Sequence, residues 1–357
     1  MNLYYHRFNR SATYICCILI VIPLCLTIYQ EKRVVKIHNI KDFAKIRYNL
    51  DGKYLLVNDI DFENYKPTIL TENVCDKNNI FNGHFQGNGH VITNLHYPLF
   101  HCIGSNGVVE NLKLTSVNID LSDVNNIGTL TYYNYGSIKG IYVNGMVMGN
   151  ETVGGIVGSN QGYFKQVHFD GTVTGIRSIG GITGIGTTQL EITETQVTGR
   201  VEGRLLVGGI AGELIVPSDN VVVYNNLIEA DVVGDSFVGG VAGYTITKTN
   251  WNVITGNVIG ETCVGLVSGR KNTPSSSDLF IGSISGYDQE SFESIFVKDD
   301  VNIGTEIPYE YLVTYEELTN YTWLIENIGL DPKIWEIEIT SSGVNLKIKS
   351  ILSMNRK

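Results

Sequence analysis

Proline and basic residues are scarce in this chain of 357 residues, and each shortage excludes a class of protein. Only 7 residues are proline, about 2 % against a usual ~5 %, whereas 39 are glycine, which favours an ordered chain with tight corners over a disordered linker. Lys and Arg number 26 against 36 acidic residues, leaving a net charge of −10. Because a surface of that sign repels phosphates, we predict no nucleic-acid partner.

Cysteine is too sparse for a disulfide scaffold. Three of the six cysteines lie in or beside an N-terminal apolar run, and the other three, Cys75, Cys102 and Cys263, are widely spaced. No Cys-x-x-Cys pair suggests a zinc site. A Cys75–Cys102 bridge and two buried thiols are equally compatible with this spacing, so the sequence leaves the pairing open.

Long apolar runs are absent except for Tyr14–Tyr29, which is preceded by basic residues. This order is typical of a signal anchor or an export signal. The run is shorter than the ~20 residues of a usual membrane span, and no small-x-small cleavage site follows Leu26. We expect an uncleaved membrane anchor through residues 14–29; a cleaved signal peptide and a buried core helix are the alternatives. The first two place everything after Lys32 outside the cytoplasm, membrane-anchored or secreted.

A six-residue signature, apolar-Gly-x-apolar-x-Gly, recurs in the middle of the chain. It begins at Val153, Ile179, Val207 and Val238, and in weaker form at Val264, with spacings of 26, 28, 31 and 26 residues. A period of roughly 20 to 50 residues indicates a solenoid, whose repeats bury their apolar sides by stacking. We predict an all-β fold, a right-handed parallel β-helix of roughly eight or nine coils with three short strands per coil.

The signature also predicts which residues face inward and where the chain turns. Adjacent glycines such as Gly154-Gly155 turn a corner or allow two backbones to approach, and Asn144-Gly145 is expected to be a turn. Insertions at Leu214–Asn220 and Lys271–Asp278 are expected to project as binding loops. One apolar position per repeat should form an internal ladder: Ile156, Ile182, Ile210 and Val241.

The chain divides into four segments by pattern. After the N-terminal run, apolar residues at helical spacing predict a short helix: Ile40, Phe43, Ile46 and Leu50. Near the C-terminus, an aromatic-rich segment is expected to cap the open edge of the last coil. The predicted segments are 1–33 (cytoplasmic tail plus signal anchor or signal peptide), 34–126 (opening coils), 127–307 (repeat β-helix) and 308–357 (C-terminal cap).

Outside the six-residue signature, four further motifs stand out: Asp59-Ile60-Asp61, Phe81-x-Gly-x-Phe85-x-Gly-Asn-Gly-His90-x-Ile92, Gly107 to Leu112 and the closing Trp323 to Trp335. Together with the signature, these motifs resemble the GLUG-repeat family of extracellular β-helical surface proteins. The resemblance spans Ile37 to Ile348 and implies a cell-surface β-helix. Such repeats occur in adhesins, in large surface proteins and in immunoglobulin A1-specific metallopeptidases. Because the chain has no His-Glu-x-x-His motif, the resemblance does not carry over a zinc-peptidase role.

Two clusters of titratable residues suggest metal or acid–base chemistry. Four histidines fall within 18 residues, at His84, His90, His96 and His101. Their spacing fits neither a helical pair nor a finger, so we predict no metal site there. Asp59 and Asp61 share one strand face, as paired carboxylates for catalysis or calcium would. Carboxylates that prevent edge-to-edge pairing explain them equally well, and we assign them a structural role.

An active site along one face of the stack would require acidic residues at the same position of successive coils. Asp170 and Asp231 stand at related places, but the neighbouring coils have Thr198 and Thr255 there. Gly184-Ile185-Gly186 lacks the lysine and the strand-to-helix context of a phosphate loop. We therefore predict no catalytic, cofactor-binding or metal-binding residue, and no cofactor.

These observations predict a non-catalytic cell-surface interaction or adhesion scaffold, not an enzyme, with an extracellular glycan or protein as its ligand. The alternative is a carbohydrate-active β-helix enzyme of the polysaccharide lyase or glycosidase type, which a carboxylate cluster in a groove would support. A third class, an accessory subunit that presents another protein, would instead have a large exposed apolar patch.

Overall fold

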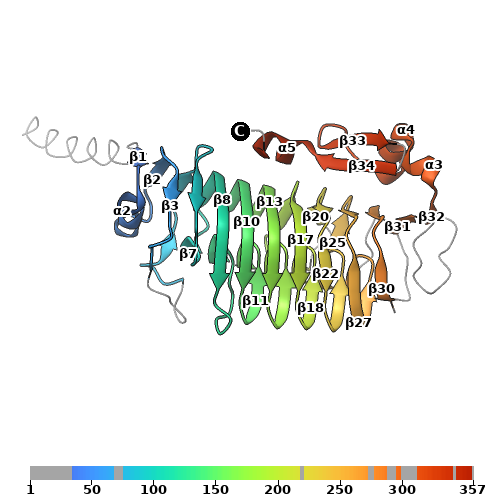
Figure 1. The fold of residues 1–357 in the computed structure, drawn as a ribbon, viewed down its shortest axis with the longest axis horizontal. Coiled ribbons are helices and arrows are strands. Elements are labelled where there is room, and N and C mark those ends of the chain that lie inside the picture. Colours follow the sequence, from blue (N-terminus) through green and yellow to red (C-terminus); the bar gives the residue numbers. More distant parts are fainter. Residues whose placement is uncertain are drawn as a thin grey trace, which may run out of the picture.

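The protein is an elongated parallel β-solenoid with few helices (Figure 1). The predicted anchor at 14–29 lies outside the described residues, as do residues 218–220 and 272–276 of the two predicted binding loops. Within the described part of the chain, no helix has the length and apolar character that crossing a bilayer requires. The computed structural model describes residues 34–67, 75–217, 221–271, 277–287, 295–298, 312–340 and 343–355.

One face of the solenoid is a parallel sheet of eight strands, one from each coil, which gives about eight coils. Each strand is only two to four residues long, and its backbone groups are satisfied by the coils on either side. In chain order the strands are β4 (Ile80–Phe81), β7 (Phe100–Ile103), β9 (Thr131–Asn134), β12 (Val157–Asn160), β15 (Thr183–Gly186), β19 (Ala211–Leu214), β24 (Ala242–Thr245) and β28 (Ser268–Lys271).

The rest of each coil belongs to a second sheet of 24 strands that wraps around the other faces. Its opening strands are β1 (Val34–Ile37), β2 (Lys53–Leu56), β3 (Ile60–Asp61), β5 (His84–Gln86), β6 (Val91–Thr93) and β8 (Val108–Asp120). Its middle strands are β10 (Ser137–Met148), β11 (Glu151–Gly154), β13 (Tyr163–Thr174), β14 (Arg177–Gly180), β16 (Glu191–Thr193), β17 (Gln196–Glu202) and β18 (Leu205–Gly208).

The same sheet continues to the end of the stack. Its last strands are β20 (Val221–Tyr224), β21 (Leu227–Ile228), β22 (Asp231–Val233), β23 (Ser236–Gly239), β25 (Lys248–Asn250), β26 (Val253–Ile254), β27 (Val258–Gly265), β29 (Asp278–Phe280), β30 (Ile284–Tyr287), β31 (Ile295–Lys298) and β32 (Leu312–Val313). The predicted turn at Asn144-Gly145 is wrong: β10 runs through it and pairs residue for residue with β13, and only its register with β8 shifts there.

The repeated signature sets the register of the stack. Its successive starts are paired in adjacent strands, Val153 with Ile179, then Val207, Val238 and Val264. The predicted apolar ladder is confirmed, since all four of its residues are fully buried. A Cβ added to Gly155 would lie 2.3 Å from the carbonyl oxygen of Gly181, so this corner requires glycine.

Seven consecutive coils bend at the same place, at a residue with φ between 52° and 62°. We call this the bend position. The residue after it faces inward, and the next residue faces outward. Only one of the seven is glycine, although positive φ is costly for other residues. The bend positions are Asn111, Gly140, Gln166, Glu194, Asn225, Trp251 and Ser277.

The C-terminal segment forms a small module that we call the closing module. Thr314 and Glu317 form a capping box at the start of its first helix. An antiparallel hairpin follows the helices. The elements are α3 (Tyr315–Leu318), α4 (Tyr321–Trp323), a π-helical turn (Leu324–Ile328), β33 (Trp335–Thr340), β34 (Gly343–Ile348) and α5 (Lys349–Asn355).

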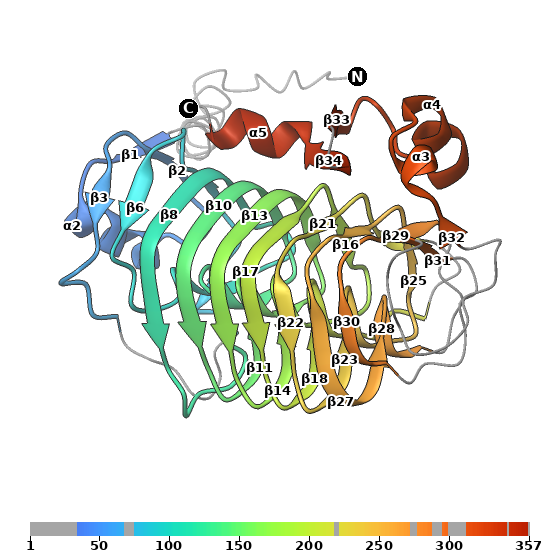
Figure 2. The same ribbon diagram turned by 45° about the vertical axis from the view of Figure 1, so that its right-hand side comes forward.

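The closing module lies along one side of the stack and runs back from the last coils toward β8 (Figures 1 and 2). Trp335 is buried in a second core with three apolar side chains of the stack, Leu227, Val253 and Leu279. Its indole nitrogen donates a hydrogen bond to Oδ1 of Asn225 at 3.3 Å. The sequence predicted a cap over the last edge; the module instead covers the flank of several coils, because those coils present apolar residues outward.

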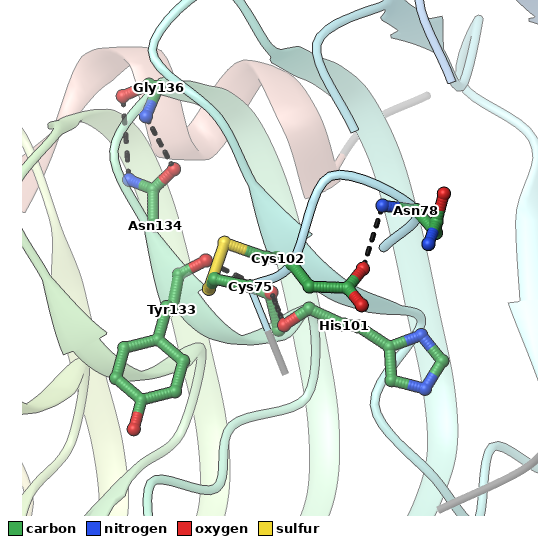
Figure 3. Close-up of a disulfide and its surroundings, with 9 residues drawn as sticks. Cys75, Asn78, His101, Cys102, Tyr133, Asn134 and Gly136 are labelled. Carbon is green, nitrogen blue, oxygen red and sulfur yellow. Dashed lines mark hydrogen bonds between the residues drawn. A yellow bond between two sulfur atoms is a disulfide. The ribbon is translucent and has the colours of Figure 1, made fainter. Parts of the chain in front are cut away.

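The opening end of the stack is closed by the short helix predicted there, α2 (Ile40–Phe43), which continues as a 3-10 helix (Ala44–Tyr48). Asn39 caps it by accepting hydrogen bonds from the amides of Lys41 and Asp42. Nearby, Cys75 and Cys102 form a disulfide (Figure 3). The pairing that the sequence left open is thus present, and it fixes the segment before β4 to β7.

Candidate functional site

Two neighbouring hollows of about 380 Å³ each lie between the closing module and the flank of the stack. Gln166 lines the first and Lys165 the second, and both side chains contact Glu194. We call the two together the flank groove. The first hollow is lined by residues that include Gln86, Asn111, Lys113, Tyr142, Gln166 and Ser353. The second is lined by residues that include Lys139, Tyr163, Lys165, Glu191, Glu194 and Tyr224.

Glu194 is the most enclosed charge in the second hollow. Its residue surface is only 8 % exposed. Its carboxylate lies 3.0 Å from Nζ of Lys165 and accepts a hydrogen bond of 3.1 Å from the amide of Gln166. Burial opposes ionisation of Glu194, but the hydrogen bonds that its carboxylate accepts, led by that from Lys165, outweigh burial and lower its pKa. The hollow therefore holds a fixed carboxylate at its wall.

Tyr224 and Glu191 form a second polar pair in the same hollow. The Tyr224 hydroxyl donates a short hydrogen bond to Oε1 of Glu191. Burial, followed by this bond to a carboxylate, raises the pKa of Tyr224 to about 12. At neutral pH the tyrosine is therefore a neutral donor rather than a base. The pair offers polar atoms for binding, not an activated nucleophile.

Asp170 anchors the wall beside the first hollow. Its carboxylate accepts hydrogen bonds from the Tyr142 hydroxyl at 3.3 Å, the Asn144 amide at 3.0 Å and the Thr198 hydroxyl at 2.8 Å. Next to it, His168 is 6 % exposed, and its Nε2 lies 3.2 Å from Oγ1 of Thr198. Burial lowers the pKa of His168 to about 4, so this imidazole is neutral at physiological pH.

The four histidines of the opening coils do not converge on one site. Three of them pair with separate carboxylates: His84 with Glu110 at 2.7 Å, His90 with Asp59 at 3.0 Å and His96 with Glu63 at 3.5 Å. The ring of His101 stacks on Tyr132. In the stretches that the structure describes, no three His, Cys, Asp or Glu side chains are grouped to hold a metal ion.

The predicted carboxylate pairs have separate structural roles. Asp59 also accepts a hydrogen bond from the amide of Val91, and Asp61 accepts one from Asn94. Asp170 and Asp231 lie in different columns of the stack: Asp170 is paired with Thr198, whereas Asp231 is paired with Arg200. The structure therefore does not bring Asp170 and Asp231 together.

Sequence reasoning missed the flank groove. Its residues come from successive strands whose paired residues are 24 to 31 positions apart in the chain, so no short motif contains both members of a pair such as Lys165 and Glu194. Aligning the coils by their strand register would have found it, because one position, which immediately precedes the bend in the coils that have one, is polar or tyrosine in six successive coils. That column is Gln86, Glu110, Lys139, Lys165, Thr193 and Tyr224.

Comparison with known proteins gives partial matches. A segment of 86 residues is 35 % identical to halomucin from Haloquadratum walsbyi, which covers 22 % of this chain and 1 % of halomucin. The chain therefore matches only a small part of that protein. A crystal structure of a candidate immunoglobulin A1 protease from Bacteroides ovatus aligns over 90 % of this chain and 93 % of its own, with 14 % identity and a TM-score of 0.49. No functional conclusion follows from a likeness at that level.

Residues 29–145, about a third of the chain, match the N-terminal region of the M26 IgA1-specific metallo-endopeptidases. The predicted β-helical architecture is confirmed by the structure, whereas membership of the GLUG-repeat family stays a prediction. The prediction that the chain is not an enzyme is corrected by this match, because the matching model describes the N-terminal region of a peptidase family.

Proposed function

We propose that this chain is the ligand-binding β-solenoid of an extracytoplasmic protein related to the M26 peptidases, and that the flank groove is its binding surface. The observation that carries the proposal is the family match over residues 29–145. That match extends into β10 and includes Gln86, Asn111, Lys113 and Tyr142, four residues that line the first hollow. The related region thus builds most of the first hollow, whereas most of the second hollow lies beyond the match.

An extracytoplasmic location is supported by the Cys75–Cys102 disulfide, since such bonds persist in oxidising compartments and are rare in the cytosol. The charged-then-apolar N-terminal pattern supports the same location, either through a membrane anchor at residues 14–29 or by secretion. The resemblance to GLUG-repeat surface proteins agrees with both.

The matched family takes its name from immunoglobulin A1, and we propose this glycoprotein as the first ligand to test. A rigid solenoid suits the holding of a large extracellular ligand, because its stacked coils keep the groove residues at fixed spacing. Binding of this kind would serve surface adhesion as well as presentation of a substrate to a peptidase.

The test is binding of immunoglobulin A1 to the immobilised full chain, measured by biolayer interferometry, with cleavage followed on gels in the presence of Zn²⁺. Ser353 is exposed on α5 and lines the first hollow, so Ser353→Trp should obstruct the groove and weaken binding at least ten-fold. Lys41→Ala, on the exposed face of α2, is the matched control and should bind normally.

Two results would contradict the proposal. No binding by the unmodified chain would exclude immunoglobulin A1 as its ligand. Binding that is equal for the unmodified chain and Ser353→Trp would place the binding surface elsewhere. A cleavage product would extend the function of the chain from binding to catalysis.

A further inference from the structure

We infer that the flank groove binds an extended glycan that carries carboxylate groups and lies along the axis of the stack. The inference rests on the proposed function in taking the groove as the binding surface, and it adds the chemistry of the ligand. Three features of the groove carry it: its length, its side-chain types and the balance of its charges.

The length follows from the register of the coils. The polar column crosses six coils from Gln86 to Tyr224. At ~4.8 Å per coil its floor is ~24 Å long. A floor of repeated polar positions at even spacing suits a repeating polymer better than a compact small molecule.

The backbone of the groove argues against an extended peptide. A peptide that adds to a sheet requires a strand edge with free backbone donors and acceptors. Here β10 is paired with β8 on one side and with β13 on the other, and β13 is paired in turn with β16 and β17. Recognition must therefore come from side chains.

Those side chains are of the types that bind sugars. Amide groups of Gln86 and Gln166 and the Tyr142 hydroxyl line the first hollow. In the second hollow Tyr163 is 50 % exposed beside Glu191, and its ring offers a flat apolar surface for the face of a pyranose ring. Concave sites with a few fixed polar groups and an aromatic ring give orientation as well as affinity.

The charges of the groove select an acidic glycan over a neutral one. Among the described residues that line the first hollow, Lys113 alone is charged, and in the second hollow Glu194 is paired with Lys165. By contrast, Lys113 and Lys139 have no ion-pair partner within the described ranges, and each lines one of the two hollows. This leaves positive charge on the floor of the groove that a ligand carboxylate can pair with.

The experiment measures binding of a hyaluronan hexasaccharide to the full chain by calorimetry, with chitohexaose as the neutral comparison. We expect hyaluronan to bind at least ten-fold more tightly than chitohexaose, and added salt to weaken it. Lys139→Ala and Lys113→Ala should each reduce affinity at least five-fold, Lys139→Arg should retain it, and Lys41→Ala should have no effect. Circular dichroism checks that each variant is folded.

A second arm separates a free polysaccharide from a glycan attached to a protein, by measuring immunoglobulin A1 before and after enzymatic removal of its glycans. Binding that requires those glycans supports the inference even without hyaluronan binding. If hyaluronan does not bind and immunoglobulin A1 binds equally with and without its glycans, the inference is wrong and the proposed function stands. Hyaluronan binding without immunoglobulin A1 binding supports the inference and excludes immunoglobulin A1 as a ligand. Equal affinity for chitohexaose, or unchanged affinity in both lysine-to-alanine variants, also overturns the inference.

Discussion

The early and late coils follow the same backbone path at the bend position but reverse the polarity of the two residues that follow it. In the early coils the inward residues are apolar and the outward ones polar: Leu112, Ile141 and Val167 inward, with Lys113, Tyr142 and His168 outward. In the late coils the inward residues are polar and the outward ones apolar: Asn226, Asn252 and Asp278 inward, with Leu227, Val253 and Leu279 outward.

Both arrangements are stable because each satisfies its buried groups. The inward amides of the late coils bond from coil to coil: Nδ2 of Asn226 donates to Asn252 at 2.8 Å, and Nδ2 of Asn252 donates to Asp278 at 2.9 Å. Their outward apolar partners are covered by the closing module. The outward residue therefore decides whether the flank is covered or forms a groove.

Of the substitutions that test this difference between early and late coils, Leu227→Lys should reduce stability most. It gives a late coil the outward lysine of an early coil and places an ammonium group under the closing module. We expect a loss of roughly 4 kcal/mol in the free energy of unfolding, or detachment of the module. Urea unfolding and hydrogen exchange in β33 and β34 measure the two outcomes. Unchanged stability together with unchanged protection would show that the module does not depend on an apolar flank.

Asn252→Leu should have the next largest effect, because it converts an inward late position to the apolar type of the early coils. Asn226 and Asp278 would each lose a buried hydrogen-bond partner, at about 3 kcal/mol in total. Asn257→Ala, at a half-buried site that bonds Asp231, is the control and should cost less than ~1 kcal/mol. Equal urea midpoints for the two variants would contradict a special role of the buried ladder.

His168 makes the early coils sensitive to acid. Burial lowers its pKa to about 4 from 6.5, so between these values the unfolded chain binds more protons and stability falls as the pH falls. From pH 7 to pH 5 the expected loss is ~2 kcal/mol. His168→Gln should remove that part of the pH dependence. Urea midpoints at both pH values measure it, and an identical drop in the variant would assign the effect to other groups.

Lys113→Leu should have the smallest effect on stability. It gives an early coil the outward leucine of a late coil, at a partly exposed site that lines the hollow beside α5 and lies outside the second core, so little apolar surface is newly buried. The free energy of unfolding should change by less than ~0.5 kcal/mol, while hyaluronan binding should be lost. A thermal scan and calorimetry on the same sample provide both readouts. A large stability change would mean that Lys113 supports the fold rather than the groove.

The sequence predicted what repeats locally and missed what is assembled across coils. The signature at Val153 and its successors predicted the period, and the structure confirms it in the register of the strands. By contrast, Lys139, Lys165 and Glu194 meet only because successive coils stack, and no short motif records that contact. The expected turn at Asn144-Gly145 failed for a related reason, since pairing with β13 keeps those residues in one long strand.

The sequence by itself determined the solenoid, its period and its internal ladder, because these depend on glycine and apolar residues that recur at fixed spacing in each coil. Only the tertiary structure decided where the closing module packs, that Cys75 pairs with Cys102 and that a polar groove remains over the early coils. These features depend on which residues face outward in coils far apart in the chain. Whether an outward residue is apolar or polar affects stability only when the closing module folds back along the flank.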